Sequence, residues 1–418
     1  MPGTPPTHAK GTSRFHLMLA FAYLLLIVYG SLFPFGPWIP PSGSMWHYLV
    51  APWPHDISGA DVATNLLAYV PVGLLLIWCL PRARWLASFV FGMAVGSGLS
   101  SLMEAIQSYL PERTSSKVDL LNNVIGSAAG AILGLLFRPE ARTRFWLDEQ
   151  RRAWFKLDRA ADVTLAATAM WLLSQWTPLV PETDVGAVRH ALSPIRAVFE
   201  HPKTFGVLHF ATYLFAAAGL MLALQLASRP EKRLMRYLPF LFGAAILAKM
   251  FVTTRFVSLE ALLGIMAATL LLAALGGRAG PGTAALLVLA AFVATETRSA
   301  DGTLQGFNWM PFYGEYVNTL NGFQEVLDGL WPFVALAAIA FERNSPKPRT
   351  LAVGTAFVAL LSFVCEWAQR FIPGRYPDIT SAILAVLGWG FGCWWIARGE
   401  REESRPKTSD ITDLPSRN

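Results

Sequence analysis

Apolar residues are gathered into twelve long stretches along this chain, separated by shorter polar connections. Most stretches come close to the roughly 20 residues that an α-helix needs to cross the hydrocarbon core of a bilayer. They cover residues 15–33, 62–80, 85–107, 119–137, 163–181, 205–228, 237–253, 256–276, 282–297, 325–342, 350–370 and 379–397. The pattern predicts an all-α integral membrane protein with about 12 transmembrane helices.

Composition agrees with this prediction. The 418 residues are 54% hydrophobic and only 15% charged, whereas soluble domains carry about 25% charged residues. The net charge is +6, but the basic residues are sorted by connection, so nucleic-acid binding is not expected. Cys79, Cys365 and Cys393 lie in apolar stretches without metal-ligand spacing, so no metal site, disulfide framework or cofactor is predicted.

The sorting of basic residues predicts the topology, because short cytoplasmic connections are enriched in Lys and Arg. With the N-terminus inside, the inner connections hold 24 of the 34 Lys and Arg residues, the outer ones hold nine, and Lys249 lies within a stretch. Both termini are therefore expected in the cytoplasm. The protein is expected to be a multi-pass protein of the bacterial inner membrane, in contact with membrane lipids.

A polar motif occurs twice, each time between two apolar stretches. Without a gap, residues 104–126 align with residues 366–388. The identical pairs are Glu104 and Glu366, Gln107 and Gln369, Pro111 and Pro373, Arg113 and Arg375, Val124 and Val386, and Gly126 and Gly388. In the middle of the chain, Lys249 and Arg255 have the spacing of Gln107 and Arg113. This internal repeat predicts three tandem four-helix units.

The repeat predicts the domain boundaries. The expected parts are a disordered cytoplasmic N-terminus (1–14), unit 1 (15–138), a basic cytoplasmic linker (139–162), a degenerate unit 2 (163–277), unit 3 (282–398) and a disordered cytoplasmic tail (399–418). Because the linker is rich in basic and aromatic residues, we expect it to form a helix on anionic lipid at the inner leaflet.

Polar residues at membrane depth are the candidate ligand-binding groups, because each ionisable one needs a partner or a water-filled cavity. In unit 1 they are Asp61, Asn65, Glu104, Gln107, Arg113, Asp119 and Asn122. Unit 3 has Glu366, Gln369 and Arg375, and unit 2 has His209, Lys249, Arg255 and Glu260. Two interpretations are open. Either each Glu contacts its Arg and fixes a turn, or the groups line an outward-facing pocket in which arginine faces phosphate or carboxylate.

Unit 1 resembles the VanZ-like family of small bacterial membrane proteins. The resemblance rests on residues 61–73, on the E-x-x-Q and P-x-R motifs, and on D-L-L-N-N-V-I-G at 119–126. Unit 3 matches more loosely and differs at three polar positions, with Ser381 for Asp119, Leu384 for Asn122 and Ala385 for Asn123. The resemblance implies a polytopic cell-envelope protein and supplies no reaction. Some relatives are associated with resistance to glycopeptide antibiotics such as teicoplanin.

These observations favour a non-catalytic protein that binds or shields a ligand at the outer face of the inner membrane. The ligand classes are a cell-wall precursor, a lipid-linked saccharide or a peptide. A transporter is the alternative, since parallel repeats occur in transporters, and an enzyme acting on a polyprenyl-linked substrate is a third. Because unit 3 lacks the polar residues around Asp119, binding is expected in unit 1.

The charge bias predicts which connections react with an impermeant thiol reagent. Single cysteines placed in 36–56, 185–200 and 299–320 of a cysteine-free variant should be labelled from the periplasm, because these connections lie outside. A cysteine in 140–155 should be labelled only after the membrane is permeabilised. Periplasmic labelling of 140–155 would contradict the topology.

Overall fold

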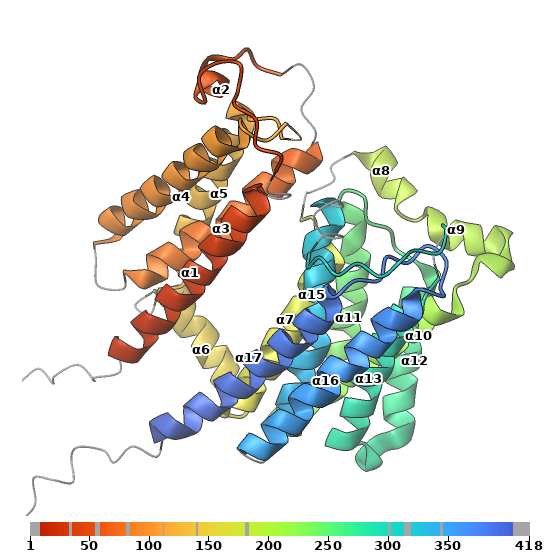
Figure 1. Ribbon diagram of the computed structural model, residues 1–418. Helices are drawn as coiled ribbons and strands as arrows, with labels where there is room; N and C mark the ends of the chain where they lie inside the picture. The colour runs from red at the N-terminus through yellow and green to blue at the C-terminus, as the bar shows by residue number, and fades with distance from the viewer. Residues whose placement is uncertain are drawn as a thin grey trace, which may run out of the picture. The chain divides into compact units, whose positions relative to one another are not determined.

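The structure is a computed structural model that describes residues 9–32, 36–54, 59–80, 84–111, 113–138, 141–179, 184–299, 302–312, 319–342 and 346–403. These residues form helices and their connections, and the only β-pairing among them is two isolated bridges (Figure 1). The chain divides into two compact units, Met1–Arg151 and Arg152–Asn418. The first contains predicted unit 1, and the second contains predicted units 2 and 3.

The N-terminal unit is a bundle of four long helices with one short helix. They are α1 (Ala9–Leu32), α2 (His47–Val50), α3 (Gly59–Cys79), α4 (Trp85–Gln107) and α5 (Lys117–Leu136). The helix α6 (Arg142–Trp154) follows, within the linker for which a basic helix is predicted. Its contact with lipid stays a prediction.

Glycines bring α3 and α5 into close contact. A Cβ atom added at Gly130 would lie 1.9 Å from the carbonyl oxygen of Val70, and one at Gly126 would lie 2.2 Å from that of Leu66. No residue with a side chain fits at these distances, so the two backbones approach as in other tightly packed membrane helices. On α4, by contrast, a Cβ at Gly98 would meet nothing within 4 Å.

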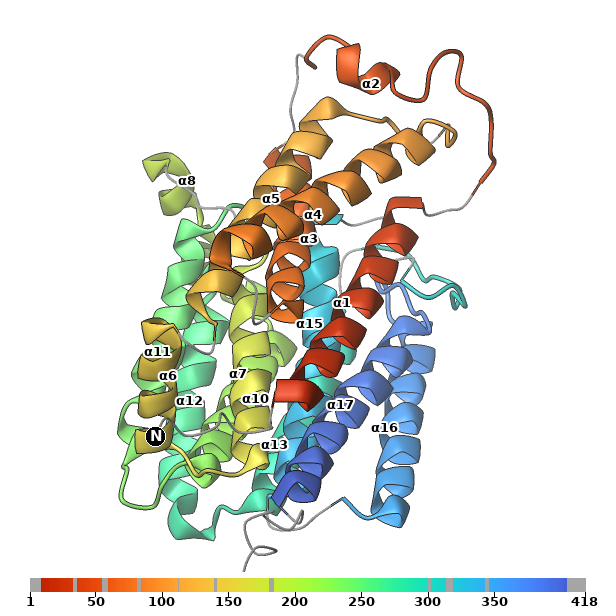
Figure 2. The same ribbon diagram turned by 90° about the vertical axis from the view of Figure 1, so that its left-hand side faces the viewer.

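The C-terminal unit contains the remaining helices. They are α7 (Arg159–Trp176), α8 (Val185–His190), α9 (Ser193–Glu200), η1 (Pro202–Thr204), α10 (Val207–Ala227), η2 (Leu234–Arg236), α11 (Leu238–Leu247), η3 (Ala248–Phe251), α12 (Leu259–Leu275), η4 (Gly276–Arg278), α13 (Pro281–Glu296), α15 (Thr319–Ala340), α16 (Pro348–Gln369) and α17 (Thr380–Glu403). Figure 2 shows α16 and α17 side by side, in agreement with their packing contacts.

Predicted units 2 and 3 interlock within the C-terminal unit. The first helix of unit 2, α7, packs along α15 of unit 3, and the first helix of unit 3, α13, packs along α10 of unit 2. Aromatic contacts lie along this core: the ring of Trp171 stacks on that of Phe242 at 4.9 Å, and Phe292 meets Phe333 at 4.9 Å. One buried core therefore joins the two predicted units.

All twelve predicted stretches coincide with helices, the stretch 237–253 with α11 and η3 together. In the described part of the chain, nine helices are long and apolar enough to cross a membrane. The helix α13 and the apolar part of α1 are shorter, and α7 is not among the nine. The all-helical prediction is confirmed, while twelve crossings and the cytoplasmic termini stay predictions.

The ends of the chain differ from the predicted boundaries. The helix α1 begins at Ala9, within the segment predicted to be disordered, and α17 continues to Glu403. The other residues of the two predicted tails, 1–8 and 404–418, lie outside the described part of the chain.

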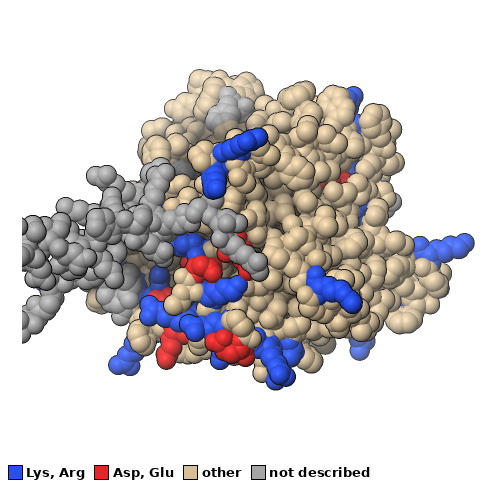
Figure 3. Space-filling model, turned by 90° about the horizontal axis from the view of Figure 1, so that it is seen from below, with Lys and Arg blue, Asp and Glu red and all other residues tan. Residues whose placement is uncertain are grey.

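Figure 3 shows basic and acidic side chains clustered on one part of the face that it draws, with a few separate basic side chains among uncharged residues elsewhere. In the C-terminal unit, Lys156 before α7 forms a 2.9 Å ion pair with Glu342 after α15. Large apolar residues are instead exposed along the helices, for example Phe240, Leu270 and Leu360, as expected for faces in contact with lipid.

The contact between α3 and α5 predicts that Gly130→Ala destabilises the N-terminal unit. The new methyl group meets backbone, which cannot rotate away, so we expect a loss of about 1–3 kcal/mol, as for other overpacked cores. The measurement is the unfolding temperature of the purified protein in detergent. Gly98→Ala is the matched control and should be neutral or stabilising, because alanine favours a helix by up to about 1 kcal/mol over glycine. Equal effects of the two substitutions would contradict the packing argument.

Candidate functional site

In the N-terminal unit, residues at the end of α4 contact the end of α1. The amide of Gln107 donates a hydrogen bond to the carbonyl oxygen of Ser31 at 2.7 Å, and Arg113 donates to that of Gly30 at 3.4 Å. The last carbonyl groups of a helix have no partner within the helix, and a cation is favourable there. The two side chains therefore cap α1.

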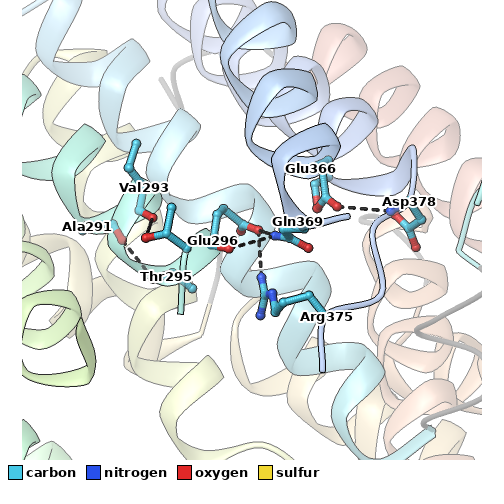
Figure 4. A network of polar contacts seen from close by, with 10 residues as sticks. Ala291, Val293, Thr295, Glu296, Glu366, Gln369, Arg375 and Asp378 are labelled. Carbon is cyan, nitrogen blue, oxygen red and sulfur yellow. Dashed lines mark hydrogen bonds and ion pairs between the residues drawn. The ribbon is translucent and has the colours of Figure 1, made fainter. Parts of the chain in front are cut away.

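The C-terminal unit repeats this contact at the end of α13. Gln369 donates to the carbonyl oxygen of Glu296 at 3.1 Å and also to the Glu296 carboxylate. Arg375 forms a 3.0 Å ion pair with the same carboxylate. Figure 4 shows Gln369 and Arg375 converging on Glu296, while Glu366 lies toward Asp378.

In the middle of the chain, Lys249 and Arg255 reach the end of α7. Arg255 donates to the carbonyl oxygen of Thr177, the residue after the helix. Lys249 donates to Oε1 of Gln175 at 3.4 Å and to the hydroxyl of Tyr213 at 3.0 Å. In each predicted unit, then, the end of the third helix contacts the end of the first. We call this contact the terminal frame.

The two motif glutamates bond backbone N–H groups and not, as predicted, the arginine of the same motif. Glu104 accepts a hydrogen bond from the backbone N–H of Ser116 at 2.8 Å, and Glu366 accepts from that of Asp378 at 3.1 Å, in both cases twelve residues later. Each carboxylate thus ties the third helix of its unit to the start of the fourth, where backbone N–H groups need acceptors.

The predicted contacts between Glu104 and Arg113 and between Glu366 and Arg375 are therefore not direct ion pairs. Both residues of each pair lie in the described chain, and each arginine reaches the end of the first helix instead. In unit 2, Ile246 occupies the position three residues before Lys249. The start of α12 is capped by the Ser258 hydroxyl, which accepts from the N–H of Ala261 at 3.2 Å.

The other candidate residues of unit 1 largely satisfy one another. Asn65 donates to the Asp119 carboxylate at 2.7 Å and so joins α3 to α5. Asp61 lies close enough to interact electrostatically with Asp119. Asn122 is buried, and its side-chain N–H₂ group has no hydrogen-bond partner among the described residues. The geometry brings these residues together as links between helices.

A pocket of about 650 Å³ lies beside the terminal frame of unit 2. Its lining residues are Gly206, Val207, Leu208, His209, Tyr213, Lys249, Thr254, Arg255, Phe256, Arg298, Ser299 and Gln324. Ligand pockets typically measure about 300–1,000 Å³. Of the candidate residues of unit 2, His209, Lys249 and Arg255 line this pocket, and Glu260 lies behind it and accepts from the N–H of Gly206 at 2.9 Å.

Two pocket residues, Arg298 and Gln324, were not among the predicted site residues. They come from the end of α13 and the start of α15, far along the chain from Lys249, and no shared motif links them. The packing of α13 along α10, and of α15 along α7 and α13, brings them to the pocket.

The segment that carries Arg255 has an uncommon backbone conformation. Thr254 has φ of 64°, in the left-handed region that β-branched residues rarely adopt. Such strain is kept where the surroundings hold it, and Thr254 itself lines the pocket beside Arg255. Burial lowers the pKa of Arg255, and nearby Asp328 acts in the opposite direction. An arginine remains protonated at neutral pH.

Residues 17–138 match the family model described as VanZ/LLP1. The N-terminal unit is VanZ-like. Searches of curated proteins and of solved structures gave no match. Together with the apolar helices, the match supports a multi-pass membrane protein whose residues 17–138 are similar to VanZ/LLP1 proteins.

The VanZ-like match includes the terminal frame formed by Gln107 and Arg113 but ends before the pocket. The first pocket residue, Gly206, comes well after residue 138. Any role of the pocket must therefore be argued from its own residues and not from the VanZ-like match.

The third terminal frame predicts a loss of stability in Arg375→Gln. The side chains of Arg375 and Glu296 are only 23% and 12% exposed, so removing the arginine leaves a largely buried carboxylate unpaired. We expect a loss of about 3 kcal/mol, the lower end of the range for buried pairs, measured as the unfolding free energy in detergent. The double variant Arg375→Gln/Glu296→Gln should recover part of it.

The control is Arg196→Gln, which breaks the exposed pair of Arg196 with Glu200, where the side chains are 82% and 51% exposed. No measurable change in stability is expected there. If Arg375→Gln is also silent, the terminal frame does not stabilise the unit.

Proposed function

We propose that this VanZ-like membrane protein binds a lipid-linked or cell-wall ligand at the outer face of the inner membrane, without transforming it. The observation that carries the proposal is the pocket of about 650 Å³ in the C-terminal unit. It lies where α10 begins and α13 ends. The predicted topology places these helix ends outside.

The pocket combines space with convergent polar groups, as ligand sites do. The Tyr213 hydroxyl and the Lys249 ammonium are 3.0 Å apart at its wall. The His209 ring lies 5.2 Å from the Tyr213 ring, and Gln324 adds an amide. These groups can orient a polar head, while Val207, Leu208 and Phe256 give apolar contact.

The contrast between the terminal frames supports placing the ligand in unit 2 and not, as the sequence favours, in unit 1. In unit 3, Arg375 forms an ion pair with the carboxylate of Glu296. In unit 1, the Asp119 carboxylate accepts a hydrogen bond from Asn65. In unit 2, Lys249 and Arg255 also line open space.

If the protein acts in the cell envelope, the proposal can be tested by the survival of cells on an antibiotic. Binding of a cell-wall precursor or of a lipid-linked saccharide or peptide at the outer face would shield that molecule from a glycopeptide antibiotic. The resemblance of the N-terminal unit to VanZ-like proteins makes survival on teicoplanin the appropriate phenotype. The proposal assigns the pocket to ligand binding and the N-terminal unit to the membrane scaffold.

The test is to fill the pocket from its rim. Ser299 is exposed and lines the pocket, so Ser299→Trp should occupy the space without disturbing the core. Native mass spectrometry of the protein released from its own membranes should show a bound lipid-linked adduct in the wild type and in Ser299→Ala. The adduct should be absent in Ser299→Trp, and survival on teicoplanin should fall with it at equal membrane abundance. An adduct and a survival rate unchanged in Ser299→Trp would overturn the proposal.

A further inference from the structure

We propose that the pocket of the C-terminal unit binds a phosphate-bearing group, held by Lys249, Arg255 and Arg298. The inference rests on the proposed function, because it names the chemistry of the ligand in the same pocket. Neither the family match nor the sequence motif includes all three cations.

The charge of the lining carries the inference. Its twelve residues include three cations and no carboxylate. The cations come from three separate segments: Lys249 from η3, Arg255 from the turn before α12, and Arg298 from the end of α13. Like charges brought together at a partly enclosed surface repel one another, and an anion between them removes this repulsion.

Arg298 is the cation most available to a ligand. It is exposed, and its guanidinium forms no hydrogen bond or ion pair with any residue of the described chain. Its five N–H donors match the oxygen atoms of a phosphate. Lys249 is only 8% exposed, and its two hydrogen bonds go to neutral acceptors, Gln175 and Tyr213.

Among the residues that the structure describes, two carboxylates lie behind the lining and balance only part of this charge. Glu260 is 5% exposed and accepts from the N–H of Gly206. Asp328 accepts from Gln324 at 3.1 Å and lies close enough to interact with Lys249 and Arg255. Three cations against two carboxylates leave an excess of positive charge. Arg298, at the rim, has neither carboxylate as an ion-pair partner.

The backbone adds to the attraction. The first residues of α10, Val207 to His209, line the pocket, and the N-terminus of a helix carries partial positive charge and free N–H groups. In unit 2, moreover, Ile246 stands where units 1 and 3 have the motif glutamate. The motif carboxylate is therefore missing from unit 2.

The class of anion follows from the geometry. One carboxylate offers two oxygen atoms in a plane, whereas a phosphate or diphosphate offers several oxygen atoms in different directions and more than one negative charge. Three cations on three segments, with a helix N-terminus beside them, fit a phosphate or diphosphate. The phosphate can belong to a lipid headgroup or be free, and the experiment separates these sources.

The experiment measures binding of defined probes to the full chain by isothermal titration in detergent. The probes are inorganic pyrophosphate, farnesyl diphosphate and the uncharged farnesol. We expect farnesyl diphosphate to bind and farnesol not to compete, with affinity falling as salt is raised. Arg298→Gln should weaken binding about tenfold or more, since a hydrogen bond to a charged group is lost. Arg298→Glu should abolish binding, and Arg298→Lys should restore most of it.

Arg196→Gln is the matched control, because it removes an exposed arginine outside the pocket and should leave affinity unchanged. Binding of both diphosphates supports recognition of the phosphate alone, and binding of farnesyl diphosphate only supports a lipid-attached phosphate. Affinity that is equal in the wild type and Arg298→Glu, or no binding of either diphosphate, overturns the inference. If the membrane-derived adduct is nevertheless lost in Ser299→Trp, the pocket still binds a ligand and only its assignment as a phosphate is wrong.

Discussion

Satisfying the last carbonyl groups of a helix within apolar surroundings is the constraint on which this structure depends. Where lipid surrounds a helix, water is not there to accept or donate the missing bonds. Gln107 and Arg113 supply donors to α1, and Gln369 supplies one to α13. The motif glutamates meet the opposite need, since Glu104 accepts from an N–H group at the start of α5. A short polar motif thereby fixes three helices at one end of a bundle.

The same constraint explains how one unit can diverge. Arg255 still bonds the end of α7, but Ile246 replaces the glutamate and Ser258 takes over the cap of α12. The carboxylate is no longer needed to start the fourth helix, and the motif itself no longer supplies a counter-charge in this unit. Lys249 and Arg255 thus both make a contact between helices and form part of the pocket wall.

Much of the fold follows from residue patterns, because long apolar stretches leave few alternatives to helices. The correspondence of Gln107 with Gln369 also predicted equivalent positions, and their partners are indeed equivalent helix ends. The partner of Arg375 was not predictable from spacing, since Glu296 lies on another helix and outside the motif.

For the same reason, the sequence predicts only some of the residues that line the pocket. His209, Lys249 and Arg255 stand out as polar residues in or beside apolar stretches, but Arg298 and Gln324 come from helix ends that meet only through packing. In an ordinary connection a lone arginine after a helix gives no signal. Which polar residues line space and which bond each other depends on helix contacts far apart in the chain, as for Asn65 and Asp119.

Because α7 of unit 2 packs along α15 of unit 3, the order in which the helices are synthesised limits when they can assemble. A ribosome adds about 5–20 residues per second, and 142 residues separate Trp176 from Thr319. The helix α7 therefore exists for roughly 7–28 s before synthesis of its main neighbour begins. Gln175 meets Tyr213 and Lys249 earlier, but during that interval the buried Ser174 lacks its neighbour Asp328 of α15. The two interlocked units must complete their assembly together and late, whereas the N-terminal unit has all its helices before α7 leaves the ribosome.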